Sequence, residues 1–222
     1  MAQRRYYKVE VIERTGFIMP TDDREAITYL INDGIDASSD DEDAKLAQGV
    51  AGVDLDADDD ELVAICASST IDNGKPNCRG VCAVHFPAEK KAPRFWSVTR
   101  HGTDLTNIRV DYCAALEAIE CANELDPDRN KKLVVYTSNQ SLIYSMAGKR
   151  PVDDWQRNNW KRKGNLVPNH DLLDDLLDGE QTRRPVRIEW RHTKDTTTST
   201  WVLGLYTAAQ KEAKKLVRQT QP

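Results

Sequence analysis

The sequence predicts an α/β fold, a mixed five-stranded sheet with flanking helices behind a small N-terminal β/α extension. Two observations predict it. Between positions 62 and 100, short runs rich in β-branched residues are separated by turn-forming residues, as in an antiparallel meander. From position 111 onward, stretches with apolar residues at helical spacing alternate with two further short strand-like runs. The predicted order of the main domain is β-β-β-α-β-α-α-β-α.

Composition divides the chain into three parts. Residues 1–36 form a small extension, in which Tyr6 to Glu13 alternates like a strand and Asp22 with Glu25 offers a capping box to a short helix. Residues 37–60 are rich in Asp and poor in large apolar side chains, which predicts a solvated acidic linker. Residues 61–218 form the main domain.

The elements of the main domain follow from its periodicities. Strands are expected at 62–68, 80–86 and 95–100, with breaks at Asn73-Gly74 and Pro87, and again at 133–136 and 186–190. Helices are expected at 111–125, 141–146, around 172–177 and at 201–217, because apolar residues recur there every three or four positions. The sequence contains no internal repeat.

Overall composition fits a folded protein. Of the 222 residues, 30% are charged and 39% are hydrophobic, which disfavours a wholly disordered chain. No apolar run approaches the roughly 20 residues that span a bilayer, and the N-terminus lacks the apolar stretch of a secretory signal. We therefore expect a soluble intracellular protein, nuclear or cytoplasmic, without a membrane partner. The net charge of −5 hides locally basic segments at 149–163 and 183–191.

The five cysteines, Cys66, Cys78, Cys82, Cys113 and Cys121, lie within or beside predicted strands and a helix, so we expect free buried thiols. Two of them precede a histidine, and thiolate and imidazole are the usual ligands of zinc. Alternation along the strand, however, points His85 away from the cysteines. We expect no bound metal and no other cofactor.

Four local strings resemble the type 1 ribonuclease H family. Cys66-Ala67-Ser68-Ser69, followed by Asn73-Gly74, resembles the first-strand string Cys-Asp-Gly-Ser with its Gly-rich turn. Residues 106–111 resemble Thr-Asn-x-Arg-x-Glu, and residues 136–140 resemble Tyr-Thr-Asp-Ser-Gln. The tryptophan-bearing basic segment 155–164 and the string 167–173 resemble the basic protrusion and the Asn-x-Asp-Leu string after it. The resemblance covers about residues 61 to 217 and implies a ribonuclease H-like fold.

The resemblance also locates the catalytic positions. Family members hold two divalent cations, roughly 4 Å apart, with four carboxylates. Laid onto this chain, these positions fall at Ala67, Asp111, Ser138 and Gly204, so only Asp111 keeps a carboxylate. Three of the four metal-binding acids are missing, which implies a pseudo-ribonuclease H with no catalytic residue.

Parts of the family's nucleic-acid-binding apparatus are matched by other residues: Thr106, Asn107, Gln140, Trp155, Arg157, Trp160, Lys161, Arg162 and Lys163. Each has a structural alternative. Thr106 and Asn107 suit a helix cap, the two tryptophans suit packing between helices, and the Lys/Arg run suits a solvated face.

Two functions follow. The first is a catalytically inactive scaffold or adaptor, within a nucleic-acid-processing complex, that docks a protein partner through the extension or the domain surface. The second is a noncatalytic binding module for RNA-containing duplexes, either RNA–DNA hybrid or double-stranded RNA. The negative net charge and the lost metals favour the scaffold, whereas the lost carboxylates lower repulsion of phosphates and favour the binding module. A residual divalent-metal-dependent ribonuclease H is a minor alternative.

Overall fold

The computed structural model describes residues 7–12, 60–89, 92–100, 104–186, 188–195 and 200–220. The helix predicted after Asp22 and the acidic linker, apart from Asp60, lie outside the described residues. Within these ranges no helix is long and apolar enough to cross a bilayer.

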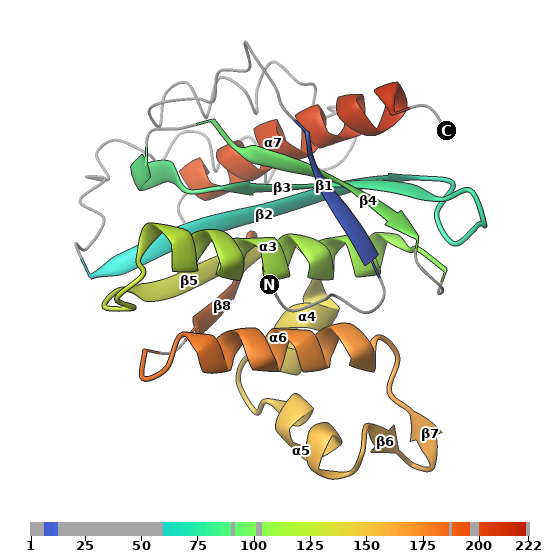
Figure 1. Cartoon of the computed structure of the whole chain (residues 1–222), viewed down its shortest axis with the longest axis vertical. Helices are drawn as coiled ribbons and strands as arrows, with labels where there is room; N and C mark the ends of the chain where they lie inside the picture. The colour runs from blue at the N-terminus through green and yellow to red at the C-terminus, as the bar shows by residue number, and fades with distance from the viewer. Residues whose placement is uncertain are drawn as a thin grey trace, which may run out of the picture.

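One mixed sheet organises the chain (Figure 1). Its strand order is β1-β4-β3-β2-β5-β8, where β1 is Tyr7–Ile12, β2 Glu61–Ile71, β3 Arg79–His85, β4 Arg94–Arg100, β5 Lys132–Thr137 and β8 Ile188–His192. The first four strands pair antiparallel, and β2, β5 and β8 pair parallel. This confirms the predicted α/β fold.

The sheet has a sixth strand beyond the five predicted for the main domain. Strand β1 of the N-terminal extension pairs with β4 along its whole length, from Tyr7 opposite Arg100 to Ile12 opposite Phe95. An unpaired edge exposes a row of backbone donors and acceptors, so β4 offers a ready template for one more strand. The extension therefore contributes to the sheet of the main domain.

Helices cover both faces of the sheet (Figure 1). The longer ones are α3 (Asn107–Leu125), α6 (His170–Thr182) and α7 (Thr200–Gln219); α4 (Gln140–Met146), α5 (Pro151–Arg157) and a 3₁₀ turn at Pro87–Glu89 are short. Buried side chains form two clusters, one between the sheet and α3, α4 and α6, the other between the sheet and α7. Alternate residues of each central strand supply the two clusters.

Several elements differ from the sequence prediction in their bounds or were not predicted at all. Helix α3 begins at Asn107, because the Thr106 hydroxyl accepts a hydrogen bond from the Arg109 amide. Helix α5 was not predicted; it starts at Pro151, a residue suited to the first turn of a helix. The basic segment after it forms a hairpin of β6 (Lys161–Arg162) and β7 (Asn165–Leu166), which was not predicted either.

All five cysteines are free and buried, as predicted. They belong to the cluster beneath α3, whereas Val81 and Ala83 of β3 face α7. Alternation therefore places His85 on the face opposite Cys82, and burial lowers the pKa of His85 to about 4.

Strand β3 approaches α3 closely at Gly80. A Cβ added there would lie 2.4 Å from Cγ2 of Val110. Gly80→Ala should therefore lower the free energy of unfolding by about 1–3 kcal/mol, measured by urea denaturation. Combining it with Val110→Ala should cost less than the sum of the two single changes, and strict additivity would show that the close approach is not the cause.

Candidate functional site

The four positions that the resemblance assigned to metal-binding acids lie on β2, α3 and α7 and at the end of β5. Asp111 is in the second turn of α3, and Ser138 directly follows β5. Ala67 is buried in the cluster under α7, so its side chain faces away from Asp111. The next residue of β2, Ser68, reaches Asp111 instead. The structure therefore brings Ser68, not Ala67, to the carboxylate.

Both oxygens of the Asp111 carboxylate accept hydrogen bonds from neutral groups. The Ser68 hydroxyl donates to Oδ1, and the Asn139 amide Nδ2 donates to Oδ2 at 2.9 Å. Asn139 is itself fixed, since its Oδ1 accepts from the Leu142 amide at 3.0 Å as the N-cap of α4. Burial raises the pKa of Asp111, while its two hydrogen bonds lower it. Asp111 thus ties β2, α3 and α4 together.

A second polar chain lies beside the first. The hydroxyls of Ser138 and Tyr206 are 2.7 Å apart, and Gln210 Nε2 donates to the Tyr206 hydroxyl at 2.9 Å. His192 Nδ1 accepts from the Lys194 amide at 3.0 Å, so its Nε2 carries the proton that bonds the Ser138 carbonyl at 3.2 Å. Burial, with a smaller contribution from Asp111, raises the pKa of Tyr206.

Tyr206 was not predicted as a site residue from the sequence. The resemblance pointed to Gly204, which is buried within α7 and has no side chain to offer. Tyr206 lies two residues later and supplies a phenol to Ser138. The available signal was a tyrosine on the apolar face of the predicted last helix, which alone does not separate a polar contact from core packing.

These residues do not fit the metal pair of the ribonuclease H family. A pair of divalent cations needs several hard oxygen ligands with negative charge. Here one carboxylate remains, and both its oxygens are already engaged. In the part of the chain that the structure describes, no three His, Cys, Asp or Glu side chains are grouped to hold a metal. Asp72, a loop acid that could have substituted, bonds Lys75 and Asn77.

Thr106 and Asn107 serve the start of α3. The Thr106 hydroxyl accepts from the Arg109 amide, and the Asn107 side chain accepts from the amide of Ile108. The Asn107 amide in turn donates to Asn73 Oδ1 at 2.8 Å. These first-turn amides therefore have protein acceptors, which leaves them unavailable to a phosphate.

The tryptophans of the basic segment pack against the core of the protein. Trp155 and Trp160 are partly buried against the cluster beneath α3. Their rings lie 6.4 Å from Tyr144 and 6.2 Å from His170, respectively, measured between ring centroids. They hold α5 and the hairpin to α4 and α6.

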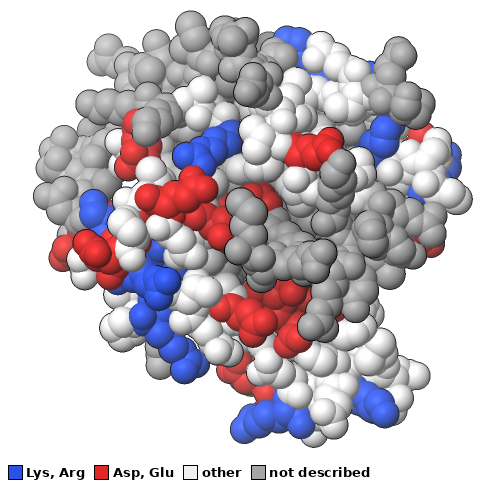
Figure 2. All heavy atoms as spheres, in the orientation of Figure 1, with Lys and Arg blue, Asp and Glu red and all other residues white. Residues whose placement is uncertain are grey.

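The cations of the same segment face solvent. Lys161, Arg162 and Lys163 are exposed on the β6–β7 hairpin, and none of them forms an ion pair with a described carboxylate. Arg157 is exposed too, but it pairs with Asp154 within α5. On the face shown in Figure 2, Lys and Arg lie at the end of the molecule formed by α5 and the hairpin, while acidic side chains gather over α6.

Helix α4 lies between the Asp111 site and the basic hairpin. Its exposed residues include Gln140, which the resemblance selected, and Tyr144, which the sequence analysis did not. Tyr144 is 57% exposed although it is a large aromatic residue. A single tyrosine at a helical position carries no signal of exposure in the sequence.

Comparison with known proteins identifies the fold alone. No protein-family model matches the chain, and no curated protein matches it in sequence. A structure of the foamy viral protease-reverse transcriptase in complex with double-stranded DNA matches with a TM-score of 0.50 and 16% identity, over 72% of this chain and 94% of that chain. LC9-RNase H1, a type 1 enzyme with the type 2 active-site motif, matches with a TM-score of 0.44 and 20% identity, over 68% and 72%. The chain has a ribonuclease H-like fold, as the resemblance implied.

The Asp111 network generates a stability prediction. Asp111→Ala leaves the Ser68 and Asn139 donors without their acceptor and should cost about 1–3 kcal/mol of unfolding free energy, measured by urea denaturation. Asp111→Asn should cost less, because an amide keeps one acceptor and the Ser68 hydroxyl can turn to accept.

The effect of Asp111→Asn on stability should depend on pH. Because the folded-state pKa of Asp111 is raised, the carboxyl contributes stability that is present at acid pH and is lost as the pH rises through that pKa. The stability of Asp111→Asn relative to the wild type should therefore increase from acid to neutral pH. If urea denaturation at several pH values gave a constant difference in unfolding free energy between Asp111→Asn and the wild type, this prediction would be contradicted.

Proposed function

We propose that this chain is a catalytically inactive ribonuclease H-like protein that binds the backbone of a nucleic-acid duplex without cutting it. The observation that carries the proposal is the basic hairpin, whose exposed Lys161, Arg162 and Lys163 form no ion pair with a described acid. Contacts of Lys and Arg with phosphates supply most of the affinity in such complexes. The matching foamy viral structure contains bound double-stranded DNA, and RNA-containing duplexes are the ligands that the sequence resemblance implies.

The absence of cleavage is proposed from the chemistry of the site. Hydrolysis by the two-metal mechanism needs one cation to activate water and another to stabilise the leaving oxygen. Ser68, Ser138 and Tyr206 offer neutral hydroxyls around Asp111, and these do not compensate the charge of two dications. The loss of negative charge also reduces repulsion of a phosphate at this site.

A protein-interaction scaffold is the second candidate. It is favoured by the edge strand β1, on which Val11 is 69% exposed, because exposed apolar residues on an edge strand suit pairing with another chain. A protein partner that co-purifies in stoichiometric amount, while the chain binds no nucleic-acid duplex, would support the scaffold over duplex binding.

The first test is catalytic. The wild-type chain should not cleave RNA–DNA hybrid in the presence of magnesium or manganese, assayed by gel electrophoresis of labelled substrate. Neither Ala67→Asp nor Ser68→Asp alone should restore cleavage, since position 67 faces α7 and Ser68→Asp returns only one of three missing acids. Metal-dependent turnover by the wild type would refute the proposal of inactivity.

The second test is binding. RNA–DNA hybrid, double-stranded RNA and double-stranded DNA are titrated at about 0.1 M salt and at higher salt by fluorescence anisotropy. The triple variant Lys161→Ala, Arg162→Ala, Lys163→Ala should bind about tenfold or more weakly. Its salt slope on B-form DNA should become shallower by roughly 0.9 for each phosphate that the variant no longer neutralises.

The matched control removes the same charge from the opposite face of the sheet. Lys211, Lys214 and Arg218 are exposed on α7, and their replacement by Ala should change the affinity much less. Equal reductions in affinity for both triple variants would indicate a general charge effect instead of a hairpin interface. Wild-type binding no tighter than the nonspecific range of roughly 10⁻⁴ to 10⁻⁶ M would remove the proposal.

A further inference from the structure

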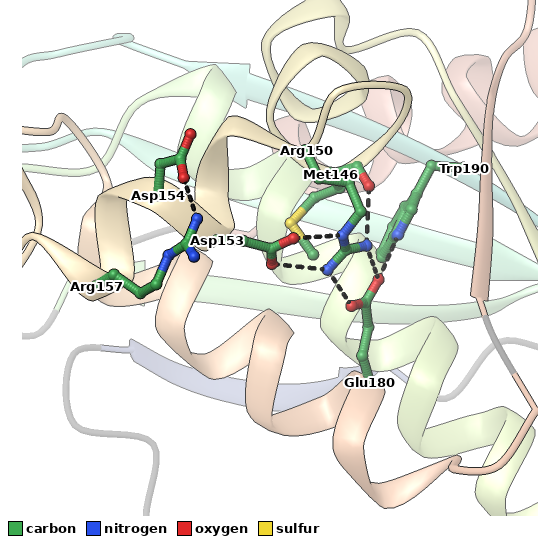
Figure 3. A network of polar contacts seen from close by, with 7 residues as sticks. All are labelled: Met146, Arg150, Asp153, Asp154, Arg157, Glu180 and Trp190. Carbon is green, nitrogen blue, oxygen red and sulfur yellow. Dashed lines mark hydrogen bonds and ion pairs between the residues drawn. The ribbon is translucent and has the colours of Figure 1, made fainter.

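Arg150 and Glu180 form a junction at the base of the basic protrusion, which we define as α5 and the β6–β7 hairpin (Figure 3). Arg150 is the residue before α5, and Glu180 lies on α6. The Arg150 Nη1 and Nη2 atoms lie 3.1 and 2.8 Å from the two Glu180 carboxylate oxygens. Such a bidentate pair fixes the orientation of both side chains as well as their separation.

Every N–H group of the Arg150 guanidinium has an acceptor. Beside Glu180, Nη1 donates to the Met146 carbonyl at 3.0 Å, and Nε and Nη2 donate to the Asp153 carboxylate at 3.2 and 3.3 Å. An arginine has five such donors, and all five are used here. Arg150 is therefore occupied within the protein and has no donor left for a phosphate.

Glu180 extends the junction to the sheet. Its Oε1 also accepts from the indole Nε1 of Trp190 on β8, at 2.8 Å, and Trp190 is buried. Through Arg150 and Glu180, the end of α4, the start of α5, helix α6 and strand β8 meet at one point (Figure 3).

The backbone at Arg150 supports the same conclusion. Its φ of 46° and ψ of 61° lie in the left-handed region, which is unfavourable for residues other than Gly, Asn and Asp. The chain turns there from α4 into α5. Because the guanidinium is held on three sides, the junction maintains this turn and with it the direction in which α5 leads into the hairpin.

We infer that Arg150 and Glu180 are positioning residues, which hold the basic protrusion at a fixed angle to the sheet so that Lys161, Arg162 and Lys163 meet an anionic duplex together. This inference rests on the proposed function for its ligand. Its physical basis is pre-organisation, because cations that are already placed lose less conformational freedom on binding.

The inference is tested by whether removal of one negative charge strengthens or weakens binding of the duplex. Glu180→Gln removes a negative charge, which by electrostatics alone strengthens binding to a polyanion. It also replaces one acceptor of Arg150 or Trp190 by a donor and so breaks the junction. Positioning predicts that Glu180→Gln weakens binding of a short RNA–DNA hybrid by about fivefold to tenfold.

Asp154→Asn is the matched control. Asp154 is an exposed acid of α5 that pairs with Arg157 and takes no part in the junction (Figure 3). The change removes the same charge at a similar place, so binding should stay unchanged or become tighter. If Glu180→Gln binds as tightly as Asp154→Asn, the junction does not position the cations.

Residue-resolved hydrogen exchange on the free full-length chain supplies an independent readout. Glu180→Gln should accelerate exchange of the amides at 151–167 and leave those of β2 and β5 unchanged, whereas Asp154→Asn should change neither. Arg150→Lys, which keeps the charge but loses the bidentate geometry, should reproduce the Glu180→Gln pattern. Unaltered exchange in both junction variants would overturn the inference, even if the hairpin binds nucleic acid. If the wild type binds no duplex, the proposed function fails while hydrogen exchange still decides whether the junction holds the protrusion.

Discussion

The alternation of side chains along β2 is the constraint on which the remaining structure depends. This central strand pairs with β3 on one side and with β5 on the other, and each of its faces is covered by a long helix. Ala64 and Cys66 face α3, whereas Ile65 and Ala67 face α7. A shift of one residue would exchange the two sets, so core packing also determines that Ser68 is the side chain next to Asp111.

The site is a closed set of neutral donors around one acid. In the ribonuclease H family the end of the central strands gathers carboxylates that cations hold together. In this chain, Ser68 and Asn139 satisfy Asp111 directly, and Tyr206 satisfies Ser138. Such an arrangement needs no ion to be stable, because these buried polar groups have protein partners. We interpret it as a site whose residues contribute to folding, in keeping with the proposed absence of cleavage.

Much of the fold was predictable because its signals are local. The strands and α3 have clear periodicities, and Thr106 is a residue type that commonly caps the N-terminus of a helix. The site was less predictable, since a string such as Cys66-Ala67-Ser68 does not say which residue faces the helix. Tyr206 and the Arg150–Glu180 junction depend on contacts between residues far apart in the chain. Strand β1 joined the sheet through pairing with β4, which no pattern within residues 7–12 encodes.

The Asp111 site and the basic hairpin, which is the proposed binding surface, occupy separate parts of this fold. The basic hairpin lies beyond α5, away from Asp111, and its position is held by packing of Trp155 and Trp160. Loss of the acids therefore leaves the hairpin intact. The central claim, that the Asp111 site holds no pair of cations, is tested most directly by anomalous diffraction from a crystal of the wild-type chain soaked in manganese. We expect no anomalous peaks at the Asp111 carboxylate, and two peaks roughly 4 Å apart beside it would contradict the claim.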